Sequence, residues 1–109
     1  MLVCGGRGYE DAVRVYAVLD DLGIDEIVEG GAEGADLIAR GWAWRREVVC
    51  HTYPAQWKKH GRSAGPLRNA QMLKANPDLD LVVAFPGGPG TANMVTQARR
   101  AGIPVTVLK

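Results

Sequence analysis

The chain has 109 residues, 47% of them hydrophobic and 23% charged, which predicts a single domain over residues 1–109 that buries its core without disulfide staples. A formal net charge of +1 argues against a broad basic field for nucleic acid, and two distant cysteines, Cys4 and Cys50, suit neither a disulfide scaffold nor a metal site. The sequence shows no membrane-spanning apolar run and no basic leader, so a cytoplasmic protein without membrane contact is expected.

Five short apolar runs alternate with helical patterns along the chain. The runs cover residues 1–4, 26–29, 48–53, 79–85 and 103–108, and the helical patterns cover 11–22, 35–47, 66–75 and 91–101. Asp11 is placed to cap the first helix, and Gly102 is placed to end the last one. Such alternation is typical of a parallel sheet with helices on both faces. The sequence therefore predicts an α/β fold, a three-layer α/β/α sandwich with a mostly parallel five-stranded sheet.

Two glycine-dense loops each follow an apolar run and precede a helical pattern. They read Gly30-Gly31-Ala32-Glu33-Gly34-Ala35-Asp36 and Pro86-Gly87-Gly88-Pro89-Gly90-Thr91. Glycine lets the main chain approach an anion closely, and the unpaired N–H groups of the following helix point at that anion. Because the carboxyl ends of parallel strands gather at one edge, both loops are expected there. They predict one divided nucleotide site with phosphate on both loops, although each also suits a simple tight turn.

Three charged side chains stand beside these loops. Arg7 follows Gly5-Gly6 at the end of the first apolar run, where a guanidinium can bind phosphate with two donors. Arg68 lies in the third helical pattern and is a similar candidate. For both arginines the alternative is a surface ion pair. Asp36 either contacts a ligand hydroxyl or only favours the helix N-terminus through the macrodipole.

The stretch Pro54–Gly65 is the least regular part of the chain. Long loops in compact domains tend to be functional. Trp57, which lies within it, either stacks on a base or caps the loop by burying itself. The stretch also carries a local basic cluster that is either a solvated surface or a contact for a phosphate backbone, formed by Lys58, Lys59, His60 and Arg62.

Taken together, these motifs resemble the SLOG superfamily of Rossmann-like domains. That superfamily includes the LONELY GUY phosphoribohydrolases, once called lysine decarboxylase-like, and DNA-processing protein A. The chain looks most similar to the small YspA-type, cpYpsA-related branch. The resemblance spans nearly the whole chain and implies a Rossmann-like fold with a ligand site. Its motifs are Val3-Cys4-Gly5-Gly6-Arg7, Gly30 to Asp36, Trp57 to Pro66 with Arg68-Asn69, and Phe85 to Thr91.

The resemblance also bears on catalysis. Phosphoribohydrolases cleave the N-glycosidic bond of a nucleoside monophosphate, using an arginine ahead of the fourth strand and a glutamate three residues past the threonine of the glycine loop. Their arginine corresponds to Arg68, but their glutamate corresponds to Met94. Methionine can neither protonate a leaving base nor steady a positively charged sugar. Hydrolysis would need a substitute acid, so the catalytic candidates are Arg68, Asp36 and Glu33.

The leading expectation is a domain that binds a nucleotide or nucleotide derivative, for sensing or scaffolding. Its phosphates are expected on the Gly31 and Gly88 loops and its base near Trp57, with no further cofactor implied. Two alternatives stay open. One is a hydrolase or transferase of the phosphoribohydrolase type. The other is a single-stranded nucleic-acid binder like DNA-processing protein A. Because superfamily members commonly pair through helices, a homodimer is also open.

Overall fold

A five-stranded sheet forms the centre of the molecule in the computed structural model, which describes residues 1–109. Every pairing between neighbouring strands is parallel, and the strand order is β3-β2-β1-β4-β5. The predicted parallel sheet is confirmed, with each strand equal to or shorter than its apolar run. The strands are β1 Leu2–Cys4, β2 Glu26–Glu29, β3 Val49–Thr52, β4 Val82–Ala84 and β5 Val105–Val107.

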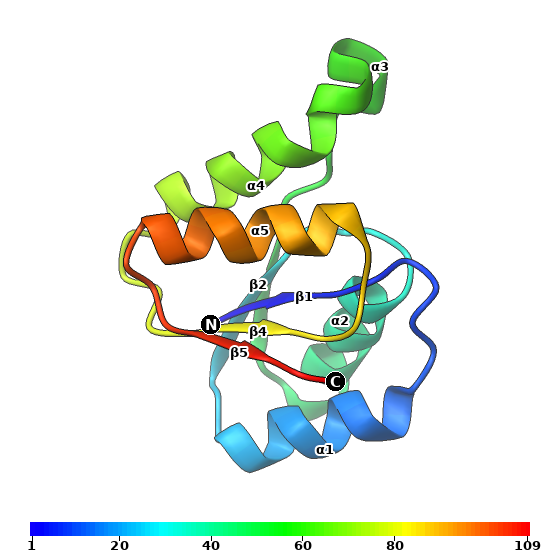
Figure 1. The fold of residues 1–109 in the computed structure, drawn as a ribbon. Helices are drawn as coiled ribbons and strands as arrows, with labels where there is room; N and C mark the ends of the chain where they lie inside the picture. Colours follow the sequence, from blue (N-terminus) through cyan, green and yellow to red (C-terminus); the bar gives the residue numbers. More distant parts are fainter.

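Helices cover both faces of this sheet. Figure 1 shows α1 and α2 on one face and α4 and α5 on the other, which confirms the three-layer sandwich. The bounds are α1 Ala12–Leu22, α2 Ala35–Arg46, α4 Ala64–Ala75 and α5 Pro89–Arg100. The Asp11 side chain accepts a hydrogen bond from the Arg14 amide at 3.0 Å and caps α1, as predicted. No helix is long and apolar enough to cross a membrane.

The stretch between β3 and α4 is more regular than expected. It contains a short helix, α3 (Trp57–His60), and a 3₁₀ turn, η1 (Gly61–Ser63), which leads directly into α4. The predicted start of the third helix at Pro66 was therefore two residues late. Proline is tolerated in the first turn of a helix because its missing N–H needs no partner there, so Pro66 does not mark the helix start. Figure 1 shows α3 projecting beyond the end of α4.

Two apolar clusters fill the spaces between the sheet and its helices. Alternate strand residues point to opposite faces, so neighbours in β1 serve different clusters: Val3 packs under α1 and α2, and Leu2 packs under α4 and α5. Trp42 of α2 is buried, and its Nε1 donates to Asp20 Oδ1 at 2.8 Å. Trp44, two residues later, is 82% exposed because it lies on the opposite side of the helix.

Candidate functional site

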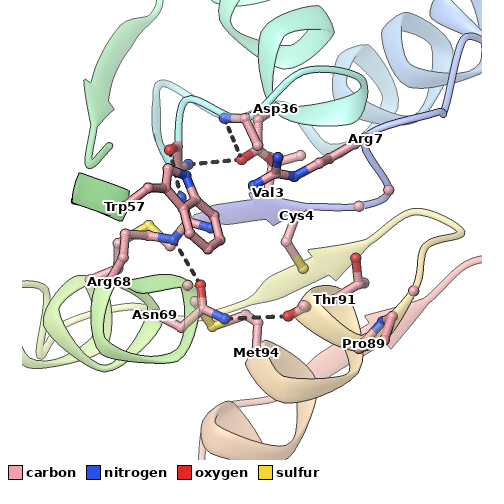
Figure 2. A pocket seen from close by; sticks show the side chains of 18 residues that line it. Val3, Cys4, Arg7, Asp36, Trp57, Arg68, Asn69, Pro89, Thr91 and Met94 are labelled. Carbon is pink, nitrogen blue, oxygen red and sulfur yellow. Dashed lines mark hydrogen bonds between the residues drawn. The ribbon is translucent and has the colours of Figure 1, made fainter. Parts of the chain in front are cut away.

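A cavity of about 510 Å³ opens at the carboxyl edge of the sheet, where β1, β2 and β4 end (Figure 2). Its walls are the loops after β1 and β2, the segment from α3 into α4, and the start of α5. The expectation that the motifs meet at one edge agrees with this arrangement. Predicted site residues that line the cavity are Gly5, Gly6, Arg7, Gly30, Asp36, Trp57, Arg68, Asn69, Gly88, Gly90 and Thr91.

The first turn of α5 presents unpaired backbone donors to this cavity. Gly88 is the N-cap residue and provides no side-chain cap, and Pro89 begins the helix with its fixed φ angle. Ala92 is the first residue whose N–H bonds back within the helix, to the Gly88 carbonyl at 3.0 Å. The amides of Gly90 and Thr91 therefore have no partner inside the helix. With the positive end of the helix dipole, they favour an anion at this wall.

Other glycines of the predicted loops pack backbone against backbone. The Gly6 amide donates to the Pro86 carbonyl at 3.0 Å, and a Cβ on Gly6 would lie 2.9 Å from the Gly87 Cα. A Cβ on Gly34 would overlap the Gly6 carbonyl oxygen. Close approach of three loops thus explains several glycines that were predicted to touch ligand. Gly31, Gly34, Pro86 and Gly87 do not line the cavity.

Carboxylates occupy the amides of the loop after β2. Asp36 Oδ2 accepts hydrogen bonds from the amides of Gly30 and Ala32, both at 3.2 Å, and Glu29 Oε2 accepts one from Gly31 at 2.5 Å. These three donors are not available to a phosphate. Phosphate bound by these three amides, as the sequence led us to expect, does not fit this arrangement. Burial raises the pKa of Asp36 to about 6, although the amide donors favour its ionised form.

Arg68 reaches across the cavity from α4. Its Nη1 donates to the Gly30 carbonyl at 2.6 Å and, at 3.5 Å, to that of Tyr53, while its Nε donates to Asn69 Oδ1 at 3.0 Å. Any side chain on Gly30 would overlap the guanidinium, so this glycine makes room for Arg68. Burial lowers the pKa of Arg68 from its ordinary value. Neither ion pair of the chain involves Arg68, so the surface-ion-pair alternative does not apply to it.

Arg7 and Trp57 meet at the mouth of the cavity. The Arg7 guanidinium lies 4.9 Å from the centre of the Trp57 ring, a cation–π contact, and Arg7 forms no ion pair. Trp57 is 46% exposed, so it does not cap its segment by burial. The buried Gly65 lies beneath the indole, where a Cβ would stand 3.5 Å from the ring edge. The aromatic face is therefore held at the opening, covered by one guanidinium.

The two candidate acids, Asp36 and Glu33, differ in whether they line the cavity. Asp36 is the only carboxylate among the lining residues, whereas Glu33 is exposed and lies outside the cavity. Met94, at the position of the family's glutamate, is 1% exposed and lines the cavity. Cys4 also lines it, and burial raises the pKa of its thiol to about 12, so it stays protonated at neutral pH.

Sequence reasoning missed Glu29. This glutamate is fully buried at the end of β2. Besides the Gly31 amide, its carboxylate accepts hydrogen bonds from the hydroxyl of Thr52 and, at 3.8 Å, from the thiol of Cys50. An acidic residue at the end of an apolar run was the available signal, because a buried carboxylate needs such donors.

Comparisons with known proteins identify the family of this chain. The model of the family described as YspA, cpYpsA-related SLOG matches residues 1–60, which run from β1 through α3 and include the loops after β1 and β2. The chain is also similar to the Gene 61 protein of Mycobacterium phage D29, with 38% identity over an alignment of 115 positions that covers 96% of this chain and 92% of the phage protein. Nearly end-to-end similarity and the family match lead to one conclusion: this chain belongs to the YspA, cpYpsA-related SLOG family.

Proposed function

We propose that this protein binds a nucleotide or nucleotide derivative for sensing or scaffolding, without turning it over. The observation that carries the proposal is the convergence of the uncapped first turn of α5 with the guanidinium groups of Arg7 and Arg68 in one cavity. Free helix-terminal amides favour an anion, and guanidinium groups bind phosphate through charge-assisted hydrogen bonds. The cavity volume of about 510 Å³ lies in the range typical of small-ligand sites.

The contacts also orient the proposed ligand. Phosphate is assigned to the first turn of α5 and Arg68 rather than to the start of the loop after β2, because the amides of Gly30, Gly31 and Ala32 already bond to Asp36 and Glu29. The Asp36 carboxylate would also repel a phosphate placed against that loop. Its Oδ1 accepts no hydrogen bond within the chain and suits a ligand hydroxyl. The base would lie against the exposed part of the Trp57 indole that Arg7 does not cover.

Native mass spectrometry tests this proposal directly. Protein purified from its own host under gentle conditions should carry a retained small molecule whose mass identifies the base and the number of phosphates. Calorimetric titration with AMP and ADP then measures the affinity of the emptied protein. A protein that retains no phosphate-bearing molecule, and that releases or absorbs no binding heat with either nucleotide, would exclude the proposal.

Hydrolysis of the ligand is the second candidate, and Asp36 is the observation that favours it. A carboxyl group whose pKa is raised to about 6 can donate a proton near neutral pH, as a departing base requires. Arg68 lies on the same cavity and supplies positive charge for a phosphate. The buried Met94 argues against hydrolysis, because it leaves the position of the family's catalytic glutamate without a carboxylate.

Turnover is therefore expected to be low in the unmodified protein. AMP incubated with it should yield little or no free adenine by chromatography, because Met94 cannot act as an acid. Met94→Glu should raise adenine release, and Met94→Leu should leave it unchanged because leucine is also apolar. A thermal melt accompanies each variant, since a buried glutamate costs stability. Rapid adenine release by the unmodified protein, lost in both Arg68→Ala and Asp36→Asn, would establish the enzyme instead.

Single-strand binding has support in the charge distribution. Residues 48–77 contain no aspartate or glutamate, and their basic cluster, Lys58, Lys59, His60 and Arg62, is exposed on α3 and η1. Trp57 of the same helix offers a stacking face. The near-neutral net charge of +1 and the small extent of the cluster argue against tight binding.

We expect weak or no strand binding at physiological salt. Fluorescence anisotropy with a labelled single strand across a salt series measures it. A strand held by phosphate contacts loses affinity steeply as salt rises, because each contact releases counterions, whereas AMP in the cavity responds more weakly. The triple variant Lys58→Gln, Lys59→Gln, Arg62→Gln and the single variant Trp57→Ala are the controls. Tight binding with a steep slope, lost in both controls, would make this surface a nucleic-acid groove.

A further inference from the structure

Asn69 was predicted to bind ligand, yet its side chain is already fully engaged. It is 4% exposed, at the second turn of α4. Its Oδ1 accepts from Arg68 Nε at 3.0 Å, and its Nδ2 donates to the Gly90 carbonyl at 3.3 Å and to Asn93 Oδ1 at 3.1 Å. Both amide hydrogens are thus used, so Asn69 has no donor left for a ligand.

The surrounding network permits one orientation of this amide. Asn93 Oδ1 also accepts from Gln97 Nε2 at 2.7 Å, and the same nitrogen donates to the Pro66 carbonyl at 3.1 Å. Turning the Asn69 amide over would face its oxygen toward two acceptors and its NH₂ group toward the Arg68 Nε–H. Each of these contacts would leave a buried polar group unpaired, at a cost of about 1–3 kcal/mol. The amide is therefore fixed.

Asn69 joins the two groups to which phosphate is assigned. On one side it holds Arg68, whose Nη1 continues to the Gly30 carbonyl across the cavity. On the other side it holds the Gly90 carbonyl, in the same helical turn as the unpaired amides of Gly90 and Thr91. Figure 2 shows Asn69 between the Arg68 side chain and the start of α5.

We propose that Asn69 is a positioning residue: it does not touch the ligand but holds Arg68 and the first turn of α5 at one spacing, so that a phosphate meets both together. The proposal rests on the proposed phosphate site. Groups held in place before binding lose less conformational entropy when the ligand arrives, and the surrounding hydrogen bonds supply that order. Asn69 acts through Arg68 and through the first turn of α5, so removing Arg68 should remove most of its effect on affinity.

The first experiment needs no ligand. In the ¹H–¹⁵N NMR spectrum, the Arg68 Nε–H signal should be resolved and slow to exchange with water in the unmodified protein. Asn69→Ala should broaden it or speed its exchange. Asn76→Ala is the matched control, because Asn76 is the C-cap residue of α4, donates to the Tyr53 hydroxyl and the Met72 carbonyl, and neither contacts Arg68 nor lines the cavity. An Arg68 signal that is unchanged in Asn69→Ala would overturn the proposal.

The second experiment is a double-mutant cycle on AMP affinity. Asn69→Ala should weaken AMP binding about tenfold, corresponding to the ~1.4 kcal/mol expected for a lost hydrogen bond to a charged group. In the Arg68→Ala background the same change should cost about twofold or less, because neighbours that act as a unit are not additive. Fully additive losses would mean that Asn69 acts independently of Arg68, which would overturn the proposal. Unchanged affinity with a lowered melting temperature would mean a purely structural role.

The two experiments separate this proposal from the proposed function. If AMP, ADP and inorganic phosphate all fail to bind the unmodified protein, the phosphate site is excluded, while the Arg68 signal still decides whether Asn69 positions that side chain. If Asn69→Ala does not fold, Asn93→Ala replaces it in the cycle. That change removes the hydrogen bond from Asn69 to Asn93 and leaves the one from Asn69 to the Gly90 carbonyl, so it should weaken AMP binding by a smaller factor, and no change in affinity would count against the proposal.

Discussion

Replacing Gly88 with aspartate is expected to remove most of the affinity for a phosphate-bearing ligand while the fold survives. A Cβ at Gly88 meets no atom within 4 Å, and the residue has a negative φ of −102°, so the backbone accepts a side chain there. Aspartate is also a preferred N-cap residue, whose carboxylate bonds to the amides two and three positions on. Those are the amides of Gly90 and Thr91, to which we assign phosphate. The variant thus fills the anion site with its own negative charge.

The expected loss is roughly 2–4 kcal/mol, or about 30- to 1000-fold in Kd, because a second anion would have to share a partly buried site. Calorimetric titration with AMP measures it beside a thermal melt. Gly88→Asn is the matched control, since asparagine has the same shape and also caps helices but carries no charge. It should lose less affinity than aspartate at similar stability. A folded Gly88→Asp protein with undiminished affinity would move the phosphate away from α5.

Regular elements with clear boundary residues were predictable from the sequence. The first helix is an example: Asp11 caps it and Gly23, at a positive φ of 61°, ends it, so both ends were marked by residues whose local chemistry is strong. The short α3 and η1 were not predictable. A helix of one turn is too short to show a 3.6-residue pattern, and α3 continues through η1 into α4 at its C-terminal end.

The site was predictable only in part, because glycine is selected for two different reasons. At Gly88 and Gly90 a Cβ would enter open space, as expected where a ligand approaches. At Gly6 and Gly87 a Cβ would strike the backbone of a neighbouring loop, which needs glycine whether or not any ligand binds. The residue type is the same in both cases. Only the arrangement of the loops in space distinguishes the two roles.

The hydrogen-bond acceptors of the loop amides were likewise not predictable from the sequence. Asp36 was weighed as a ligand contact or a helix-terminal charge, but it bonds back to the loop before it, at Gly30 and Ala32. Glu29 bonds forward to Gly31 in the same manner. A carboxylate within reach of glycine amides can bind them as well as a phosphate can. This competition explains why two similar loops have different amide partners.

The largest effect on stability is expected for Gly34→Ala. Gly34 has a positive φ of 79°, and a Cβ there would overlap the Gly6 carbonyl oxygen. That oxygen accepts the Ala35 amide at 3.3 Å, so the collision lies at the start of α2, which packs on the core. The atoms that this Cβ would strike belong to the backbone of Gly6 and Arg7, so no flexible side chain can move aside to make room. The change should therefore cost about 1–3 kcal/mol for a backbone conformation, φ 79° with ψ −129°, that residues other than glycine rarely adopt, and about 1–3 kcal/mol more for the displaced loop.

Gly61→Ala separates these two contributions. Gly61 has nearly the same backbone conformation as Gly34, with φ 54° and ψ −129°, but a Cβ there meets no atom within 4 Å. Its loss in free energy of unfolding should come from the backbone conformation alone, whereas the loss in Gly34→Ala should come from both the backbone conformation and the displaced loop. Urea unfolding of the two variants and the unmodified protein measures the difference, which should be about 1–3 kcal/mol with little change in the m-value. Equal losses would show that the loops after β1 and β2 are not in backbone contact. The cavity wall would then lack the close packing that holds Arg7 and Asp36 on the same side of the site.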